Sequence, residues 1–171
     1  RIKVIFNAAI NRYKIISTSP IDNVIIGTSK EQSNKRALTQ MEFNRLIANT
    51  KNPKYKLMFL LAGTCGLRVG EILGLTWDSI DFKGSIVNIT KQWKNISPFT
   101  TGFGELKSKN SYRTVPVPLE TLNALQEFHK SNSNDINNRI IVYKNIQGLS
   151  QLLKSYFKKC GFDNFTIHEL R

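Results

Sequence analysis

The chain has 171 residues, enough for one domain or for one domain with part of another. Its 25 lysines and arginines against 12 acidic residues give a formal net charge of +13, which favours a polyanionic partner, nucleic acid ahead of a membrane surface. The 40% apolar content supports a packed core and excludes a disordered chain. Two cysteines are too few for the disulfide framework of a small secreted domain, so we expect reduced thiols and a cytoplasmic protein.

The longest apolar run, residues 57–62, is far too short to cross a bilayer, and no membrane partner is expected. The chain begins at Arg1 without a methionine. It ends on Arg171, at the start of a helical pattern. We therefore expect both ends to continue in a longer protein.

The first predicted element is a helix, because apolar residues from Ile2 to Ile16 recur every three or four positions. A polar and charged stretch over residues 28–37 has the composition of a linker. We therefore expect a first unit over residues 1–27 and a second over residues 38–171.

The second unit opens on Thr39 and Glu42, which have the spacing of a capping box at the start of an amphipathic helix. Pro53 begins another helix, whose centre is apolar on all sides and is therefore expected in the core. Helical structure breaks and restarts around Gly66.

Two strands are predicted next, SIVNI from Ser85 and YRTVPV from Tyr112, with a hairpin and a third strand between them. The segments PLETLNALQEFHK and LSQLLKSYFKKCG then read as helices, the second with a glycine cap. This order predicts an α+β fold that is mainly helical and carries a small antiparallel three-stranded sheet.

Arg68 is the first candidate for chemistry, because it lies among core-forming residues where an unpaired charge is too costly. Glu71 is three positions further on and within reach in a helix. Taken alone, the two favour a structural ion pair. The functional alternative is that Glu71 holds the guanidinium so that its other donors face a phosphate.

Basic residues gather at two further places. Lys107, Lys109 and Arg113 crowd one turn, which is either an ordinary solvated turn or a β-hairpin that carries a lysine into a nucleic-acid groove. In the second case, Lys107 and Arg113 are candidate DNA-binding residues. Lys154 and Lys158 lie four apart on the last long helix. They face either DNA backbone or solvent, and the sequence favours neither.

The final stretch, TIHELR, brings a histidine and an arginine close together. Thr166 and Glu169 form another capping box, which places His168 and Arg171 within the first two turns of a helix. The free amides and dipole of a helix N-terminus favour an anion, so the pair is a candidate phosphate site. On its own, His168 could be an ordinary surface residue.

Taken together, the blocks GTCGLRVGEILGLTWDSIDF, LKSKNSYRTVPVP and TIHELR resemble the tyrosine recombinases, the phage-integrase family. The resemblance runs roughly from Leu38 to Arg171 and is strongest in the first block. It implies that residues 38–171 are a tyrosine-recombinase catalytic domain. It also implies that the N-terminal helix is the end of the family's core-binding domain, which clamps DNA from the opposite side.

The resemblance also implies roles for single residues. Arg68 and Arg171 match the two arginines that clamp the scissile phosphate, and Glu71 matches the acidic residue that supports the first of them. His168 matches the histidine of the His-x-x-Arg motif, a proton carrier and phosphate ligand.

The lysine that protonates the leaving 5′ oxygen matches either Lys109 or Lys107. We prefer Lys109, because it stands just before the turn into the YRTVPV strand. The implied reaction breaks and rejoins DNA through a 3′-phosphotyrosine, and it needs neither ATP, nor a metal, nor another cofactor.

In the family, a second histidine or tryptophan and then the nucleophilic tyrosine follow the His-x-x-Arg motif. The five tyrosines of this chain all precede His168. We therefore expect the chain alone to be inactive in cleavage and monomeric in solution.

The parent protein is expected to be a phage or mobile-element integrase, a site-specific recombinase that acts on double-stranded DNA as a tetramer in the bacterial nucleoid. Accessory DNA-bending proteins are further candidate partners. The alternative is a non-catalytic, sequence-tolerant DNA-binding module in which Arg68 and Arg171 are structural.

Overall fold

The computed structural model describes residues 2–22, 24, 36–97, 100–131, 137–143, 146–163 and 165–171. The chain forms two compact units, Arg1–Asn34 and Lys35–Arg171. Most of the predicted linker over residues 28–37 lies outside the described residues.

The first unit contains the helix α1 (Ile2–Asn11). It ends before Ile16, where the predicted helix was to end, and the backbone turns at Lys14, which has a φ of 51°. A positive φ at a residue other than glycine is incompatible with a continuing right-handed helix, so the later apolar positions do not extend it.

In the second unit, α2 (Gln40–Asn49) begins at the predicted capping box. The Glu42 amide donates to Thr39 Oγ1 at 3.3 Å, and the Thr39 amide donates to Glu42 Oε2 at 2.9 Å. The next helix, α3 (Pro53–Cys65), begins at Pro53 as predicted. The Asn52 side chain caps it by accepting from the Lys54 amide at 3.0 Å.

The helix α3 forms the centre of the core. Residues 57–62 are each at most 1% exposed, which confirms that this segment is buried on all sides. The helices α4 (Val69–Gly74) and α5 (Leu119–Ser131) pack against α3, and α6 (Ile146–Lys159) brings the Phe157 ring to 5.0 Å from that of Phe59. Each such buried side chain contributes about 1.5–3 kcal/mol, so α3 is a rigid base for the turn at its C-terminal end.

The three-stranded antiparallel sheet has the order β1 (Ile80–Asp81), β2 (Ile86–Ile89), β5 (Arg113–Pro116). The predicted strands correspond to β2 and β5, and the hairpin predicted between them is present, but it does not supply the third strand of this sheet. The strands β3 (Gln92–Ser97) and β4 (Thr100–Gly104) pair only with each other. The third member is instead β1, which has two residues and is too short to show a period.

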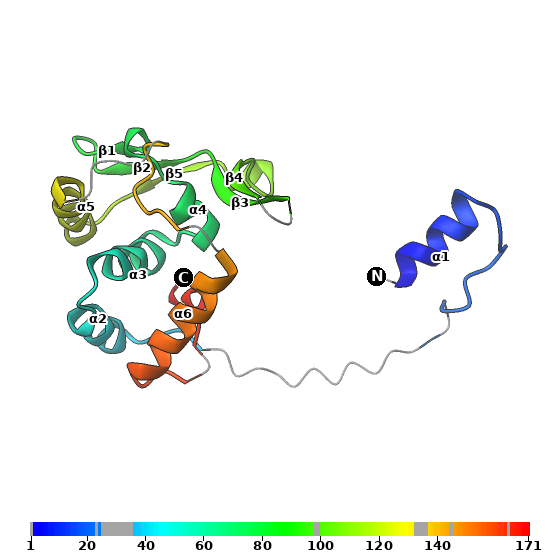
Figure 1. The fold of residues 1–171 in the computed structure, drawn as a ribbon, viewed down its shortest axis with the longest axis horizontal. Helices are drawn as coiled ribbons and strands as arrows, with labels where there is room; N and C mark the ends of the chain where they lie inside the picture. The colour runs from blue at the N-terminus through cyan, green and yellow to red at the C-terminus, as the bar shows by residue number, and fades with distance from the viewer. Residues whose placement is uncertain are drawn as a thin grey trace. The chain divides into compact units, whose positions relative to one another are not determined.

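The elements of the second unit lie in two groups (Figure 1). The sheet, the β3–β4 hairpin and α5 lie on one side, while α2, α3 and α6 lie on the other. The hairpin is held close to α4, because a Cβ added at Gly74 would come within 2.7 Å of the Gln92 Cα. Across the part of the chain that the structure describes, no helix is long and apolar enough to span a membrane.

The last element is a 3-10 helix, η3 (Ile167–Leu170), where the sequence suggested the start of an α-helix. The Thr166 amide donates to Glu169 Oε2 at 2.6 Å, so the predicted capping contact is present at its start. Ile167 and Leu170 are buried, and η3 packs against α3. The final arginine is thereby brought next to the end of α3.

Candidate active site

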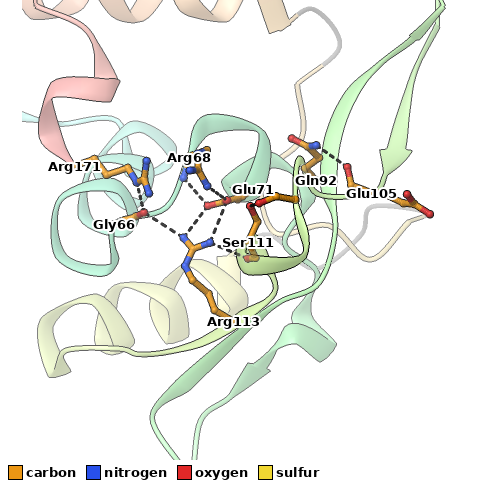
Figure 2. Close-up of polar contacts among 9 residues, drawn as sticks. Gly66, Arg68, Glu71, Gln92, Glu105, Ser111, Arg113 and Arg171 are labelled. Carbon is orange, nitrogen blue, oxygen red and sulfur yellow. Dashed lines mark hydrogen bonds and ion pairs between the residues drawn. The ribbon is translucent and has the colours of Figure 1, made fainter.

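The site is built on the backbone turn that ends α3. Gly66 takes the left-handed conformation, with a φ of 64°, which side chains other than glycine adopt only at a cost. Its carbonyl oxygen accepts from Arg171 Nε at 2.6 Å and from Arg113 Nη2 at 3.3 Å. One backbone oxygen therefore ties the end of η3 to β5 (Figure 2).

Glu71 is the buried centre of the site, at 1% exposure. It lies in the first turn of α4, where a carboxylate is favoured by the helix dipole. Its Oε2 accepts from the Arg68 backbone amide at 2.8 Å, and its Oε1 accepts from Arg68 Nη1 at 2.9 Å. The predicted Arg68–Glu71 ion pair is therefore present.

Arg113 binds the same carboxylate with both terminal nitrogens. Nη1 donates to Glu71 Oε1 at 3.1 Å and Nη2 to Oε2 at 2.9 Å, a bidentate pair of the strong kind. Figure 2 shows the contacts as a continuous chain from Arg171 through Gly66, Arg113 and Glu71 to Arg68.

These contacts fix the charge of the site. Burial alone would raise the pKa of the Glu71 carboxyl, but the hydrogen bonds from Arg113, from the Arg68 amide and from the Arg68 side chain outweigh it. The pKa of Glu71 therefore lies below its ordinary value of 4.5, and the group is ionised at neutral pH. One negative charge faces two guanidinium groups, with Arg171 beside them, so the cluster has a net positive charge.

Both Arg68 and Arg171 keep donors that can bind an anion. The Arg68 side chain is 42% exposed, and Arg171 is exposed as well. Within the described residues, Arg68 Nη2 and both terminal nitrogens of Arg171 have no hydrogen-bond acceptor on the protein. A guanidinium held on one edge and open on the other can offer donors to phosphate oxygens.

His168 lies in η3 and is exposed. Residues three apart are aligned in a 3-10 helix, so the spacing favours a common side for His168 and Arg171. The Thr166 hydroxyl also donates to the Glu169 carboxylate, which fixes the start of the turn that carries the histidine.

The two candidate lysines lie on the connection between β4 and β5, not on the β3–β4 hairpin. Lys109 begins the 3-10 helix η2 (Lys109–Ser111), and both Lys107 and Lys109 are exposed. Gln92 anchors the start of this connection, because its Nε2 donates to the Glu105 carbonyl at 2.7 Å (Figure 2). The segment is thus attached to β3 at one end and to β5 at the other.

Arg113 was expected among the DNA-binding residues, but in the structure its side chain points to Glu71. Alternate strand residues share a face, and Arg113 shares the inner face with Val115, opposite the buried Ile89 and Val87. This alternation is visible in the sequence as Arg-Thr-Val-Pro and could have indicated an inward arginine.

Lys154 and Lys158 are both exposed on α6. Each follows a buried residue, Leu153 or Phe157, so the two lysines lie along one exposed edge of the helix. This geometry is compatible with a contact to a polyanion and equally with solvation.

Three of the tyrosines form a cluster of their own. The Tyr55 and Tyr143 hydroxyls are 3.0 Å apart, and the Tyr156 ring packs edge-on against Tyr55 at 5.6 Å. Burial and the Tyr55 hydroxyl raise the pKa of Tyr143 to about 12. These contacts join α3, which carries Tyr55, to α6, which carries Tyr156, and to the segment before α6.

Cys65 lacks the environment of a reactive thiol, and the described residues contain no metal-binding group. Burial raises the pKa of the Cys65 thiol, the opposite of what a reactive thiolate requires. No group of three or more His, Cys, Asp or Glu side chains that could hold a metal occurs among the described residues.

Comparison with known proteins identifies the family. The model of the phage integrase family matches residues 36–171. The chain is 30% identical over 139 residues to the tyrosine recombinase XerC-like protein of Caldanaerobacter subterraneus subsp. tengcongensis, which covers 74% of this chain and 35% of that protein. It is also 30% identical over 145 residues to the prophage integrase IntR of Escherichia coli K12, covering 83% of this chain and 33% of IntR.

Solved structures show the same fold. The Tn1549 transposon integrase in complex with a circular intermediate DNA matches 98% of this chain and 60% of its own, with a TM-score of 0.75 and 20% identity. XerA recombinase matches 78% of this chain and 47% of its own, with a TM-score of 0.59 and 20% identity. The chain spans only about a third of the length of the XerC-like protein and IntR. The chain therefore belongs to the phage integrase family, the tyrosine recombinases.

Proposed function

We propose that this chain is part of an integrase that carries out site-specific DNA breakage and rejoining for a phage or another mobile element. The observation that carries the proposal is the pair of arginines, Arg68 and Arg171, which are held by Glu71 and Gly66 and keep donors that bind no described residue. The family membership supports the same activity.

In the proposed reaction, a tyrosine oxygen attacks the scissile phosphorus, the bond to the 5′ oxygen breaks and a 3′-phosphotyrosine forms. Negative charge on the phosphoryl oxygens is stabilised by Arg68 and Arg171; loss of one such preorganised donor typically costs about 10²–10³-fold in rate. His168 moves a proton and binds the phosphate, and Lys109 or Lys107 protonates the leaving 5′ oxygen.

The partner in this proposal is double-stranded DNA. The net charge of +13 and the exposed Lys107, Lys154 and Lys158 support contact with its phosphates. The Tn1549 transposon integrase, a protein of the same fold, was solved in complex with DNA. We further propose that the longer protein acts as a tetramer on DNA in the bacterial cytoplasm, with accessory DNA-bending proteins as candidate partners.

The proposal extends to the domains. Residues 1–27 are the end of a core-binding domain, residues 28–37 a linker and residues 38–171 the catalytic domain. The division of the chain into compact units at Asn34 and Lys35 supports a boundary in this region.

The test is a covalent-trapping assay on the full-length gene product with a nicked DNA that carries the ends of its own element, without added metal. We expect a denaturant-resistant protein–DNA adduct with the wild type, and none with Arg68→Ala or Arg171→Ala. Lys83→Gln is a matched control, because it removes an exposed positive charge from the β1–β2 turn and should leave the adduct unchanged. DNA binding without any adduct would instead indicate the non-catalytic binding module.

The same assay distinguishes Lys107 from Lys109. A substrate with sulfur in place of the leaving 5′ oxygen releases a thiolate, which needs no proton. The variant of the true general acid, Lys107→Ala or Lys109→Ala, should fail on the oxygen substrate and recover on the sulfur substrate. We expect this recovery for Lys109→Ala; recovery of Lys107→Ala alone would assign the role to Lys107.

A further inference from the structure

Arg113 uses its guanidinium inside the protein, although the basic segment around it is exposed. Its side chain is 27% exposed. Nη1 donates to Glu71 Oε1 and to the Ser111 carbonyl, each at 3.1 Å. Nη2 donates to Glu71 Oε2 at 2.9 Å and to the Gly66 carbonyl at 3.3 Å. Both terminal nitrogens are thus bound to protein acceptors.

Two of these acceptors, the Glu71 carboxylate and the Gly66 carbonyl, also hold the two proposed phosphate-binding arginines. Glu71 holds Arg68 through Nη1 at 2.9 Å, and the Gly66 carbonyl holds Arg171 through Nε at 2.6 Å. Arg113 bonds to both supports at once. Its position therefore sets where the end of α3 and the first turn of α4 lie relative to each other.

We propose that Arg113 is a positioning residue. It holds Arg68 and Arg171 at the relative positions at which both can bind the same phosphate, and it does not itself contact DNA. This inference rests on the proposed function. A lysine cannot replace it, because an ammonium lacks the planar fork that reaches both carboxylate oxygens and a carbonyl together. A phosphate at Arg113 would have to displace Glu71, which is buried and ionised.

The catalytic test compares Arg113→Gln and Arg113→Lys with wild type and Lys83→Gln, in the full-length protein. Misplacement of about 1 Å in a catalytic group can cost about 10²-fold, so we expect a loss of about 100-fold in adduct formation with Arg113→Gln. Arg113→Lys keeps the charge and should recover little of this loss. Lys83→Gln should match the wild type.

Two further readouts separate positioning from DNA contact and from loss of fold. On DNA whose scissile phosphate is replaced by an uncharged methylphosphonate, Arg68 and Arg171 have no phosphate charge to meet. The slope of the logarithm of DNA affinity against the logarithm of salt concentration should then be the same in wild type and Arg113→Gln, whereas loss of an Arg113 contact to another phosphate would reduce it by about 1. A methylphosphonate at the scissile position carries no charge and so needs the arginines less. The cleavage rate of the methylphosphonate substrate divided by that of the phosphate substrate should rise in Arg113→Gln. A lower fraction of folded protein reduces both rates equally and so leaves this ratio unchanged.

The last readout does not depend on catalysis. In the 171-residue chain, the Arg171 Nε–H should give a hydrogen-exchange-protected NMR signal, because it donates to Gly66, and Arg113→Gln should remove that protection. A protected signal that survives in Arg113→Gln, a salt slope reduced by about 1, or an unchanged rate ratio would overturn the inference. A wild-type protein that forms no adduct overturns the proposed function alone, and the NMR signal then decides whether Arg113 positions Arg171.

Discussion

Replacing Glu71 with glutamine should destabilise the second unit strongly, although the shape of the side chain is kept. The carboxylate accepts from the Arg68 amide, from Arg68 Nη1 and from both terminal nitrogens of Arg113, at 2.8 to 3.1 Å. Glutamine offers only one side-chain oxygen as an acceptor. Its amide NH₂ group would face the N–H donors of Arg68 and Arg113. Two guanidinium groups then lose the single negative charge between them.

The magnitude follows from burial. Breaking a buried ion pair by removal of one partner costs about 3–5 kcal/mol. The Arg68 and Arg113 side chains are 42% and 27% exposed, so water can partly replace the lost carboxylate. We therefore expect the lower end, about 3 kcal/mol. For a domain of this size, this corresponds to a fall in Tm of roughly 10 °C.

The assay is thermal and urea unfolding of the 171-residue chain, followed by circular dichroism at neutral pH. Glu127→Gln is the matched control, because it removes an exposed carboxylate from α5 and should change stability by less than about 0.5 kcal/mol. If Glu71→Gln lowered Tm no more than the control does, Glu71 would not be the buried centre of the site. The support of Arg68 would then need another explanation.

Three further predictions concern pH and packing. The pKa of Glu71 is lowered in the folded state and that of Glu42 is lowered to about 2, so their contributions are complete above pH 4.5 and should fade as pH falls through the lowered values. Unfolding measured between pH 7 and pH 2 should therefore show a shallower acid loss in Glu71→Gln; a parallel curve would contradict the lowered pKa of Glu71. Gly74→Ala should lower the free energy of unfolding by about 1–3 kcal/mol, because the added Cβ would lie 2.7 Å from the β3 backbone. Gly102→Ala would meet only the movable Ile96 side chain, so urea unfolding should show a smaller loss for this variant. The pKa of Tyr143 is raised to about 12 in the folded state, so its protonated hydroxyl contributes stability in full below pH 10. This contribution is lost as the pH rises from 10 toward 12. Alkaline titration of phenolate absorbance should show one late-titrating tyrosine that is missing in Tyr143→Phe.

Much of the helical part of the fold could be predicted from local patterns. The Thr39–Glu42 capping box, Pro53 at the start of α3 and the left-handed Gly66 each depend on neighbours in the chain, and the structure has all three. The all-apolar centre of α3 likewise indicated its burial, because a helix without a polar face has no side to present to water.

The sheet was harder to predict, because its pairing depends on residues distant in sequence. A strand of two residues, β1, leaves no alternation to detect, so the sequence predicts the third strand in the longer segment between β2 and β5. In the structure, β3 instead lies against α4 at Gly74. That close packing could not be inferred from either segment alone.

For the site, the sequence brought Arg68 and Glu71 together through helical spacing. The bond between Arg171 and Gly66 joins residues 105 positions apart in the sequence, and only the resemblance linked that arginine to the site. The inward direction of Arg113 follows from the alternation along β5 and from its register against β2; the alternation is visible in the sequence, whereas the register is not. A basic residue in a basic segment was therefore assigned to DNA, whereas its strand places it on Glu71.

The most direct test of the central claim is a crystal structure of this chain bound to DNA that carries its own recombination site. The quantity to measure is the distance from the guanidinium nitrogens of Arg68 and Arg171 to the nonbridging oxygens of each phosphate. We predict that both arginines lie within hydrogen-bond distance, about 3 Å, of one and the same phosphate, while Arg113 stays on Glu71. Arginines bound to different phosphates, or Arg113 turned out to the DNA, would contradict the account.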